Sequence, residues 1–309
     1  MKGFRLWYLV IVLGLVCTLY IVQHWLAKET MINGTNVSIS SYPWFVSFPV
    51  NENEYYNCGG SLIHPRAVLT AAHCVSNNYV GLPVVISPSS NIMQDSDIQK
   101  LTKNKDLSGR LKQLKTPAIQ KVLSKYGEVR TVVKVINIRD LGIQPIKDKF
   151  LTQDLAIFIL DRPSTVSPIR MASSIPREGT PLSVVGYGRT NTWVGAETAS
   201  QIPPTYSSSL QALDTIFMPI HKCKMENRTI PKGDFPDMIC GQGTKKSLCN
   251  GDSGGPLIHQ TTSGPELVGL VAFGDFGCPV NDTTFNYFTS VPFYKRTISR
   301  LVAKSVPQN

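Results

Sequence analysis

The hydrophobic positions of this chain fall into many short apolar runs that are separated by turn residues. Residues 155–160 read Leu-Ala-Ile-Phe-Ile-Leu and predict a buried strand, and residues 129–138 predict another. Glycine (23 residues) and proline (21 residues) are frequent, as expected where turns join many short strands. With 309 residues, 42% of them hydrophobic, the pattern predicts one large all-β domain or such a domain with appendages.

The end of the chain departs from the strand pattern and predicts a helix. Residues 291–306 are basic, and their apolar positions recur at helical spacing. The predicted inward face consists of Phe293, Ile298, Leu301 and Val302.

The N-terminal segment, residues 1–30, contains an uncharged run of 17 residues at positions 6–22, with two basic residues before it. A secretory signal has an apolar region of roughly 7–15 residues, and bulky Trp25 stands where a cut after Ala27 requires a small residue. A membrane-spanning helix needs roughly 17–25 residues. Signal-anchor and cleaved signal peptide both stay open, and both place the rest of the chain on the extracytoplasmic side.

Residues 251–256, Gly-Asp-Ser-Gly-Gly-Pro, have the composition of a nucleophile loop. A serine hydroxyl needs a neighbouring base to attack a carbonyl, and N–H donors must stabilise the oxyanion that forms. The glycines allow a tight turn in which Gly251 and Ser253 present such N–H groups. By itself this run also fits an ordinary turn. Upstream, His73 supplies a base, and Asp154 precedes the predicted buried strand.

The order His73, Asp154, Ser253, together with the flanking motifs, resembles the chymotrypsin-like (trypsin-fold) serine proteases. The resemblance covers about residues 31–303. Supporting motifs are Met-Ile-Asn-Gly-Thr (31–35), Cys-Gly-Gly-Ser-Leu-Ile (58–63), Thr-Ala-Ala-His-Cys (70–74), Gly-Tyr-Gly (186–188) and Asp-Met-Ile-Cys (237–240).

This resemblance implies two packed six-stranded antiparallel β-barrels followed by a C-terminal helix. It implies a serine endopeptidase that acts on protein or peptide substrates through an acyl-enzyme intermediate. Neither a cofactor nor a metal is expected: residues 76–90 contain no acidic side chain, which argues against the calcium loop of some relatives.

Six of the seven cysteines match family positions and imply an oxidising compartment. The seventh, Cys17, lies in the apolar N-terminal run, either as a small apolar residue or as a site of lipidation or intermolecular pairing. The implied disulfides are Cys58–Cys74, Cys223–Cys240 and Cys249–Cys278. Glycosylation sequons, which favour a secreted or membrane-anchored glycoprotein, occur at Asn33, Asn36, Asn227 and Asn281.

The activation site departs from the family pattern. In the family, cleavage of a zymogen frees an α-amino group, and the carboxylate at the position of Asp252 binds it; the matching terminus here is Met31. Met31 follows Thr30, although trypsin-like activators cut after Lys or Arg. Three hypotheses stay open: a cut after Lys28 with later removal of a dipeptide, an activator of different specificity, or no maturation at all.

The specificity pocket also departs from the trypsin pattern. The resemblance places Ser247 at the pocket floor, where a hydroxyl cannot neutralise a buried cation, so Lys and Arg are excluded as preferred residues. Asn286 occupies a wall position that is usually glycine, and a one-residue shift would place Phe285 or Tyr287 there. We predict cleavage after small or medium uncharged residues.

The strand that would pair with bound substrate contains Ala272, Phe273 and Gly274. Ala272 replaces a family serine whose hydroxyl supports the catalytic aspartate, and losing such a hydrogen bond costs on the order of 1 kcal/mol. We therefore expect reduced activity rather than none. Phe273 provides an aromatic wall, and Gly274 leaves the pocket entrance open.

The positive charge of the chain, +10, is concentrated in one region: residues 97–149 contain 13 Lys or Arg against 5 Asp or Glu. His73 and Asp154 are 81 positions apart, about twice the family's usual separation, which predicts an insertion near residues 91–127.

Two interpretations of the insertion stay open. One is a solvated loop with a short helix, because Leu107, Leu111 and Leu114 recur at helical spacing, broken by Gly109 and Pro117. The other is a docking surface over residues 98–126 for an acidic partner such as a sulfated glycan or anionic lipid. The compartment argues against nucleic acid as a partner.

Three classes of function follow. The intact triad favours an endopeptidase. Ala272, Asn286 and the unusual activation site favour a weak or inactive protease homologue that binds or regulates. An adhesive ectodomain that uses the basic insertion is the third class.

Overall fold

The computed structural model describes residues 31–50, 56–75, 79–102, 107–142, 152–192, 204–223, 235–274 and 278–306. The predicted signal or anchor at residues 1–30 lies outside this part. Among the residues described, no helix combines the length and the apolar character that crossing a bilayer requires.

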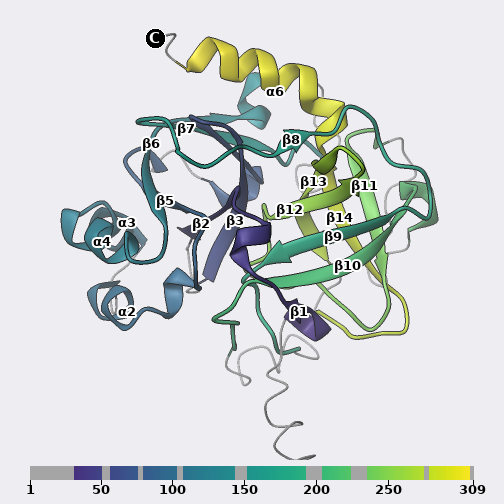
Figure 1. Cartoon of the computed structure of the whole chain (residues 1–309), viewed down its shortest axis with the longest axis horizontal. Helices are drawn as coiled ribbons and strands as arrows, with labels where there is room; N and C mark the ends of the chain where they lie inside the picture. The colour runs from purple at the N-terminus through teal and green to yellow at the C-terminus, as the bar shows by residue number, and fades with distance from the viewer. Residues whose placement is uncertain are drawn as a thin grey trace, which may run out of the picture.

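Two six-stranded β-barrels lie side by side (Figure 1). The first barrel closes in the order β2-β3-β4-β7-β6-β5. All five residues of β7 are buried. A strand that is apolar on both faces is stable only where both faces are covered by other parts of the protein. The strands are β2 (Phe45–Val50), β3 (Tyr56–His64), β4 (Ala67–Thr70), β5 (Pro83–Ile86), β6 (Glu128–Asn137) and β7 (Ala156–Leu160).

The second barrel closes through the antiparallel pairs β9–β10, β10–β11, β11–β14, β14–β13, β13–β12 and β12–β9. Two short strands join its outside: β1 (Thr35–Asn36) pairs with β10, and β8 (Arg170–Met171) pairs in parallel with β13. The predicted double barrel is therefore confirmed. The strands are β9 (Pro181–Gly186), β10 (Gln211–Met218), β11 (Met238–Gly243), β12 (Pro256–Thr261), β13 (Gly264–Gly274) and β14 (Thr284–Ser290).

The closing helix α6 (Val291–Ser305) confirms the predicted C-terminal helix and contacts β7, β8 and β13. The predicted inward face was wrong at one position: Phe293 is 36% exposed, and the neighbouring Tyr294 is buried instead. Residues four apart share a helix face, so the buried Tyr294, Ile298 and Val302 form one row that Phe293 cannot join. Leu301 is partly buried beside this row.

The insertion forms three short helices, α2 (Ser96–Thr102), α3 (Leu107–Leu114) and α4 (Pro117–Leu123), on the outer side of the first barrel (Figure 1). Gly109 lies within α3 and does not break it, whereas the proline begins α4, where its missing N–H has no cost. The helices share the core of the first barrel through Ile98, Leu114, Ile119 and Leu123. The insertion is thus a packed layer rather than a loop with one helix.

Short 3-10 helices complete the connections between strands. They are η1 (Met31–Asn33), η2 (Ile39–Ser41), η3 (Ala72–Cys74), η5 (Ile92–Gln94), η6 (Ile138–Leu141) and η7 (Ile220–Lys222).

Candidate active site

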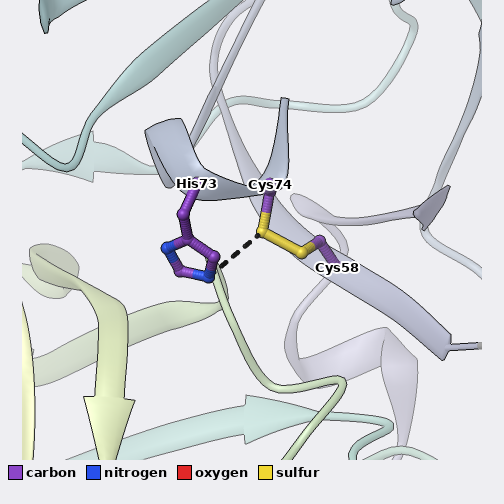
Figure 2. Close-up of side chains that lie close together, drawn as sticks. All are labelled: Cys58, His73 and Cys74. Atoms are coloured by element: carbon purple, nitrogen blue, oxygen red, sulfur yellow. Dashed lines mark hydrogen bonds between the residues drawn. A yellow bond between two sulfur atoms is a disulfide. The ribbon is translucent and has the colours of Figure 1, made fainter. Parts of the chain in front are cut away.

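His73 lies on η3, directly after strand β4 of the first barrel. The Cys58–Cys74 disulfide joins η3 to β3 and holds the histidine segment against the barrel (Figure 2). The Nε2 atom of His73 lies 3.8 Å from Cys74 Sγ, and 38% of the side chain is exposed. The ring therefore borders both the disulfide and solvent.

Asp154 fixes the orientation of the His73 ring. Its Oδ2 atom lies 2.6 Å from His73 Nδ1, and its Oδ1 atom accepts a hydrogen bond of 2.8 Å from the His73 backbone N–H. The carboxyl group is only 2% exposed. Because Nδ1 faces a carboxylate, it carries the proton in the neutral ring, and Nε2 is left to accept one.

A second buried carboxylate positions the chain around Asp154. The backbone of Gln153 is left-handed (φ 56°), and its N–H donates to Asp237 Oδ2 at 2.9 Å. The Tyr294 hydroxyl donates to the same oxygen at 2.7 Å, while Thr289 Oγ1 donates to the Asp154 carbonyl at 2.9 Å. The sequence marked Asp237 only as part of a family motif, and its contact with Gln153 depends on folding.

Arg139 is a further neighbour of Asp154 that sequence reasoning did not identify. Its Nη2 atom donates to Asp154 Oδ1 at 3.1 Å, and its side chain is 22% exposed. The Nε atom is buried without a hydrogen-bond partner. In the sequence this arginine was one of many basic residues, and only the pairing of β6 with β7 brings η6 beside the carboxylate.

The electrostatics of the pair follow from these contacts. Burial disfavours the charged form of His73, but the Asp154 charge and hydrogen bond outweigh burial, so the pKa of His73 is raised although Arg139 opposes this. Burial also disfavours ionised Asp154, yet the charge and hydrogen bonds of His73, with the charge of Arg139, lower the pKa of Asp154. Asp154 is thus held as a carboxylate.

Ser253 lies in the loop that precedes β12, against the first barrel. Its carbonyl accepts a hydrogen bond of 2.8 Å from the Gly59 N–H. A side chain at Gly254 (φ 73°) would overlap Thr70 Oγ1 and the Gly59 carbonyl. The loop is therefore pressed onto β3 and the end of β4, two residues before η3. Within the part described, no hydrogen bond joins Ser253 Oγ to the His73 ring.

Asp252 is fully buried beside Met31, which is also fully buried. A side chain at Gly186 would meet Asp252 Oδ1 at 2.5 Å and Met31 Cε at 3.0 Å, so both residues border this glycine. The carboxyl group accepts hydrogen bonds from the N–H groups of Gly188 (2.9 Å) and Cys249 (3.0 Å). Burial nevertheless raises the pKa of Asp252 to about 7.

Of the residues predicted to line the specificity pocket, Ser247 and Asn286 both contact Leu248. Ser247 is 1% exposed, and its hydroxyl donates to the Leu248 carbonyl at 3.1 Å. Asn286 is fully buried, and its Oδ1 atom accepts from the Leu248 N–H at 3.2 Å, whereas Nδ2 has no hydrogen-bond partner. Asn286 pairs with Gly274 between β14 and β13.

The neighbouring strand positions are also packed. Ala272 is buried on β13. The ring of Phe273 stacks on that of Tyr287 with centroids 4.7 Å apart. Disulfides Cys249–Cys278 and Cys223–Cys240 cross-link the surrounding segments. Together with Cys58–Cys74, they are the three pairs that the resemblance implied.

One cluster of the described residues has the composition of a metal site: Cys58, His73 and Cys74 (Figure 2). Both cysteine sulfurs belong to a disulfide and cannot act as thiolate ligands. Only the imidazole remains, so this cluster is not a metal centre.

Comparisons with known proteins place this geometry in context. The model of the Trypsin family matches residues 31–298. Trypsin beta of Drosophila erecta is 28% identical over 80% of this chain and 79% of its own length. Tryptase of Mus musculus is 26% identical over 90% of this chain and 91% of its own. The structure of neuropsin, a serine protease of mouse brain, covers 87% of this chain and 99% of its own at a TM-score of 0.61 and 19% identity, which shows a shared fold.

Proposed function

Because this chain belongs to the trypsin family of serine endopeptidases, we propose that it hydrolyses peptide bonds through Ser253, His73 and Asp154. The observation that carries the proposal is the hydrogen-bonded pair of His73 and Asp154 beside the loop of Ser253. The alternative is a protease homologue that binds partners without cleaving them, which the lack of a hydrogen bond between Ser253 and His73 within the described residues favours.

In the proposed reaction, Ser253 Oγ attacks the substrate carbonyl while His73 Nε2 takes the hydroxyl proton. The resulting imidazolium is stabilised by Asp154 and then gives the proton to the leaving amine. Water repeats these steps on the acyl-enzyme, with His73 as the base again. Closer approach of the serine to the ring is expected when substrate is bound, since such contacts tighten in the bound complex.

The oxyanion is held by the N–H groups of Gly251 and Ser253. Gly251 adopts φ 97°, a left-handed conformation that favours glycine. Within the part of the chain that the structure describes, neither N–H donates to a protein acceptor. Two free donors in one tight turn support this role.

Activation proceeds by a cut before Met31. The new α-amino group forms an ion pair with Asp252, whose raised pKa reflects burial without a cationic partner in the part of the chain that the structure describes. The burial of Met31 at the Gly186 contact supports this pairing. N-terminal sequencing of active protein tests it: Met31 is expected as the first residue, and any other start contradicts the scheme.

The specificity is not that of trypsin. Ser247 and Asn286 are buried, and neither carries a negative charge that would compensate a lysine or arginine side chain. The unpartnered Nδ2 atom of Asn286 fills a place that is usually glycine, which favours small or medium uncharged side chains.

The protease domain lies on the extracytoplasmic side, since three disulfides are typical of oxidising compartments. Membrane anchoring through residues 1–30 is part of the proposal, and carbonate washing of membranes tests it against release into the medium. Glycosylation is proposed at Asn36 and Asn281, which are exposed. Asn33 is exposed but donates its amide to the Lys245 carbonyl, and Asn227 lies outside the described residues.

The insertion offers a second binding surface for a sulfated glycan or an anionic lipid. Its exposed lysines are Lys100, Lys112, Lys121 and Lys125, with Asp97 4.0 Å from the last of these. Deleting residues 98–126 would remove part of the core, so the test uses lysine-to-serine changes at all four sites. Earlier elution from heparin is expected, while equal changes at the exposed Lys245, Arg296, Arg300 and Lys304 serve as the control. Equal losses in both variants would refute a dedicated surface.

Incubation with a peptide library tests the proposed function directly. Protein that begins at Met31 is expected to cut after small or medium uncharged residues, and Ser253→Ala is expected to cut nothing. Dominant cleavage after Lys or Arg would refute the proposed specificity. Equal behaviour of both proteins, without cleavage, would favour the inactive homologue.

A further inference from the structure

The carboxyl group of Asp154 has a charged neighbour besides His73. Its Oδ1 atom receives two hydrogen bonds, from the His73 backbone N–H at 2.8 Å and from Arg139 Nη2 at 3.1 Å, and Oδ2 faces His73 Nδ1 at 2.6 Å. Three donors on two oxygens leave the carboxylate little freedom to rotate. Of these donors, the Arg139 guanidinium carries a full positive charge, although an uncharged group could donate the same hydrogen bond.

The position of Arg139 is built into the fold. Strand β6 ends at Asn137, whose side chain accepts a hydrogen bond of 3.0 Å from the Arg139 backbone N–H and so caps η6. The N–H of Ile138 donates to the Leu155 carbonyl at 3.1 Å, one residue after Asp154. These contacts tie the segment that carries the guanidinium to the segment that carries the carboxylate.

We propose that Arg139 is a positioning residue of the active site, which locks the Asp154 carboxylate through Oδ1 and shares its negative charge with the His73 ring. The carboxylate must be shared between the guanidinium and the imidazolium that forms during catalysis. An arginine therefore fixes the geometry but leaves less negative charge to stabilise protonated His73. His73 consequently stays neutral, and able to accept a proton, at a lower pH than it would with an uncharged residue in place of Arg139.

Tyr294, Asp237 and Asp140 are further titratable groups near this cluster. Tyr294 of α6 experiences the Arg139 charge and donates to Asp237, which precedes β11. Asp140, the next residue on η6, is exposed. His73 itself responds to Asp154 and Arg139 as its charged neighbours.

The test compares Arg139→Gln, which removes the charge, with Arg139→Lys, which keeps it. The kinetic arm rests on the proposed peptidase function and records kcat/KM against pH. For Arg139→Gln we expect the acid limb to move upward by roughly half a unit to one unit, with kcat reduced about tenfold. Arg139→Lys should leave the acid limb near that of the wild type, because its charge is unchanged.

A second arm does not depend on activity. NMR titration of the His73 ring in Ser253→Ala protein, with and without Arg139→Gln, measures the histidine pKa directly; the chain has only five histidines to assign. A higher His73 pKa in the double variant supports the proposal even if the protein cleaves nothing. Equal His73 pKa values in the two proteins overturn it.

Arg170→Gln is the matched control. Arg170 Nε lies 3.0 Å from Glu266 Oε1 in an ion pair at the surface, half of the arginine side chain being exposed. Losing this pair should change neither the pH profile nor the His73 titration. If Arg139→Gln does not fold, Arg139→Lys carries the test: a His73 pKa above that of the wild type by half a unit or more would then contradict the role of charge.

Discussion

Asp154 and Asp252 are both almost fully buried carboxyl groups, yet their surroundings move their pKa values in opposite directions. Asp154 has the His73 ring and the Arg139 guanidinium within hydrogen-bond distance, and its pKa is lowered. Asp252 has two backbone N–H donors, and burial raises its pKa to about 7. Hydrogen bonds from neutral donors do not offset burial here, whereas charged neighbours do.

The two carboxyl groups differ in what completes their surroundings. The negative charge of Asp154 is already compensated in the folded chain, because His73 and Arg139 each contact one of its two oxygens. Among the described residues no cation pairs with Asp252, and the proposed activation supplies one as the α-amino group of Met31. Under the proposed activation, cleavage of one peptide bond would complete this site and order the neighbouring Ser253 loop.

The largest expected effect comes from Asp154→Asn. The amide no longer stabilises protonated His73, and it leaves the Arg139 charge without a carboxylate. We expect kcat to fall by about 10⁴-fold with KM little changed. Steady-state kinetics on a peptide substrate measure this. A fall of less than tenfold would mean that Asp154 does not assist the histidine.

Asp252→Asn should have the next largest effect, in protein that begins at Met31. Breaking a buried ion pair costs about 3–5 kcal/mol, which corresponds to a loss of roughly 10²- to 4 × 10³-fold in activity if the active loop depends on it. The measurement is kcat/KM of the processed variant. Unchanged activity would show that the Met31 terminus does not act through Asp252.

The stability of the uncut chain should depend on pH through the same carboxyl group. The unfolded pKa of an aspartate is about 3.9, and the folded pKa of Asp252 is about 7, so the folded state binds the extra proton between these values. The free energy of unfolding should therefore fall by a few kcal/mol as pH rises from about 4 to 7.

Urea denaturation of the uncut chain and of its Asp252→Asn variant isolates this contribution. His73 titrates in both proteins, so its effect cancels in the difference. The gap between the two curves should change across the pH window. A constant gap would contradict the raised pKa.

Ala272→Ser is expected to have the smallest effect. The resemblance places a serine hydroxyl here as a support for the catalytic aspartate, and one added hydrogen bond contributes about 1 kcal/mol, or a few-fold in kcat. The gain should be larger in Arg139→Gln protein than in the wild type, because both groups would serve one carboxylate. Equal gains in both backgrounds would show that the two supports are independent.

Much of the fold could be predicted from the sequence because local patterns were strong. The apolar run at residues 155–160 and the amphipathic C-terminal helix specify their structures almost alone. Phe293 was misplaced since a large apolar residue near a helix start fits two faces, and only packing selects Tyr294.

The motifs predicted the pairing of His73 with Asp154, but not the residues that support this pair. His73 and Asp154 lie within motifs, whereas Arg139 and Asp237 act from segments that only strand pairing brings near. The helical layer of the insertion was underestimated for a related reason. Its buried leucine and isoleucine residues are spread over three short helices that have no stable pattern individually.

Labelling by a fluorophosphonate, which reacts with an activated serine, tests the proposed nucleophile and its activation together. Two forms of the protein would be treated in parallel: the uncut chain and a recombinant form in which a specific protease site releases Met31 as the N-terminus. Mass spectrometry is expected to find the adduct on Ser253 in the cut form, with little in the uncut form and none in Ser253→Ala. A cut form that is folded and begins at Met31 but stays unlabelled would contradict the account.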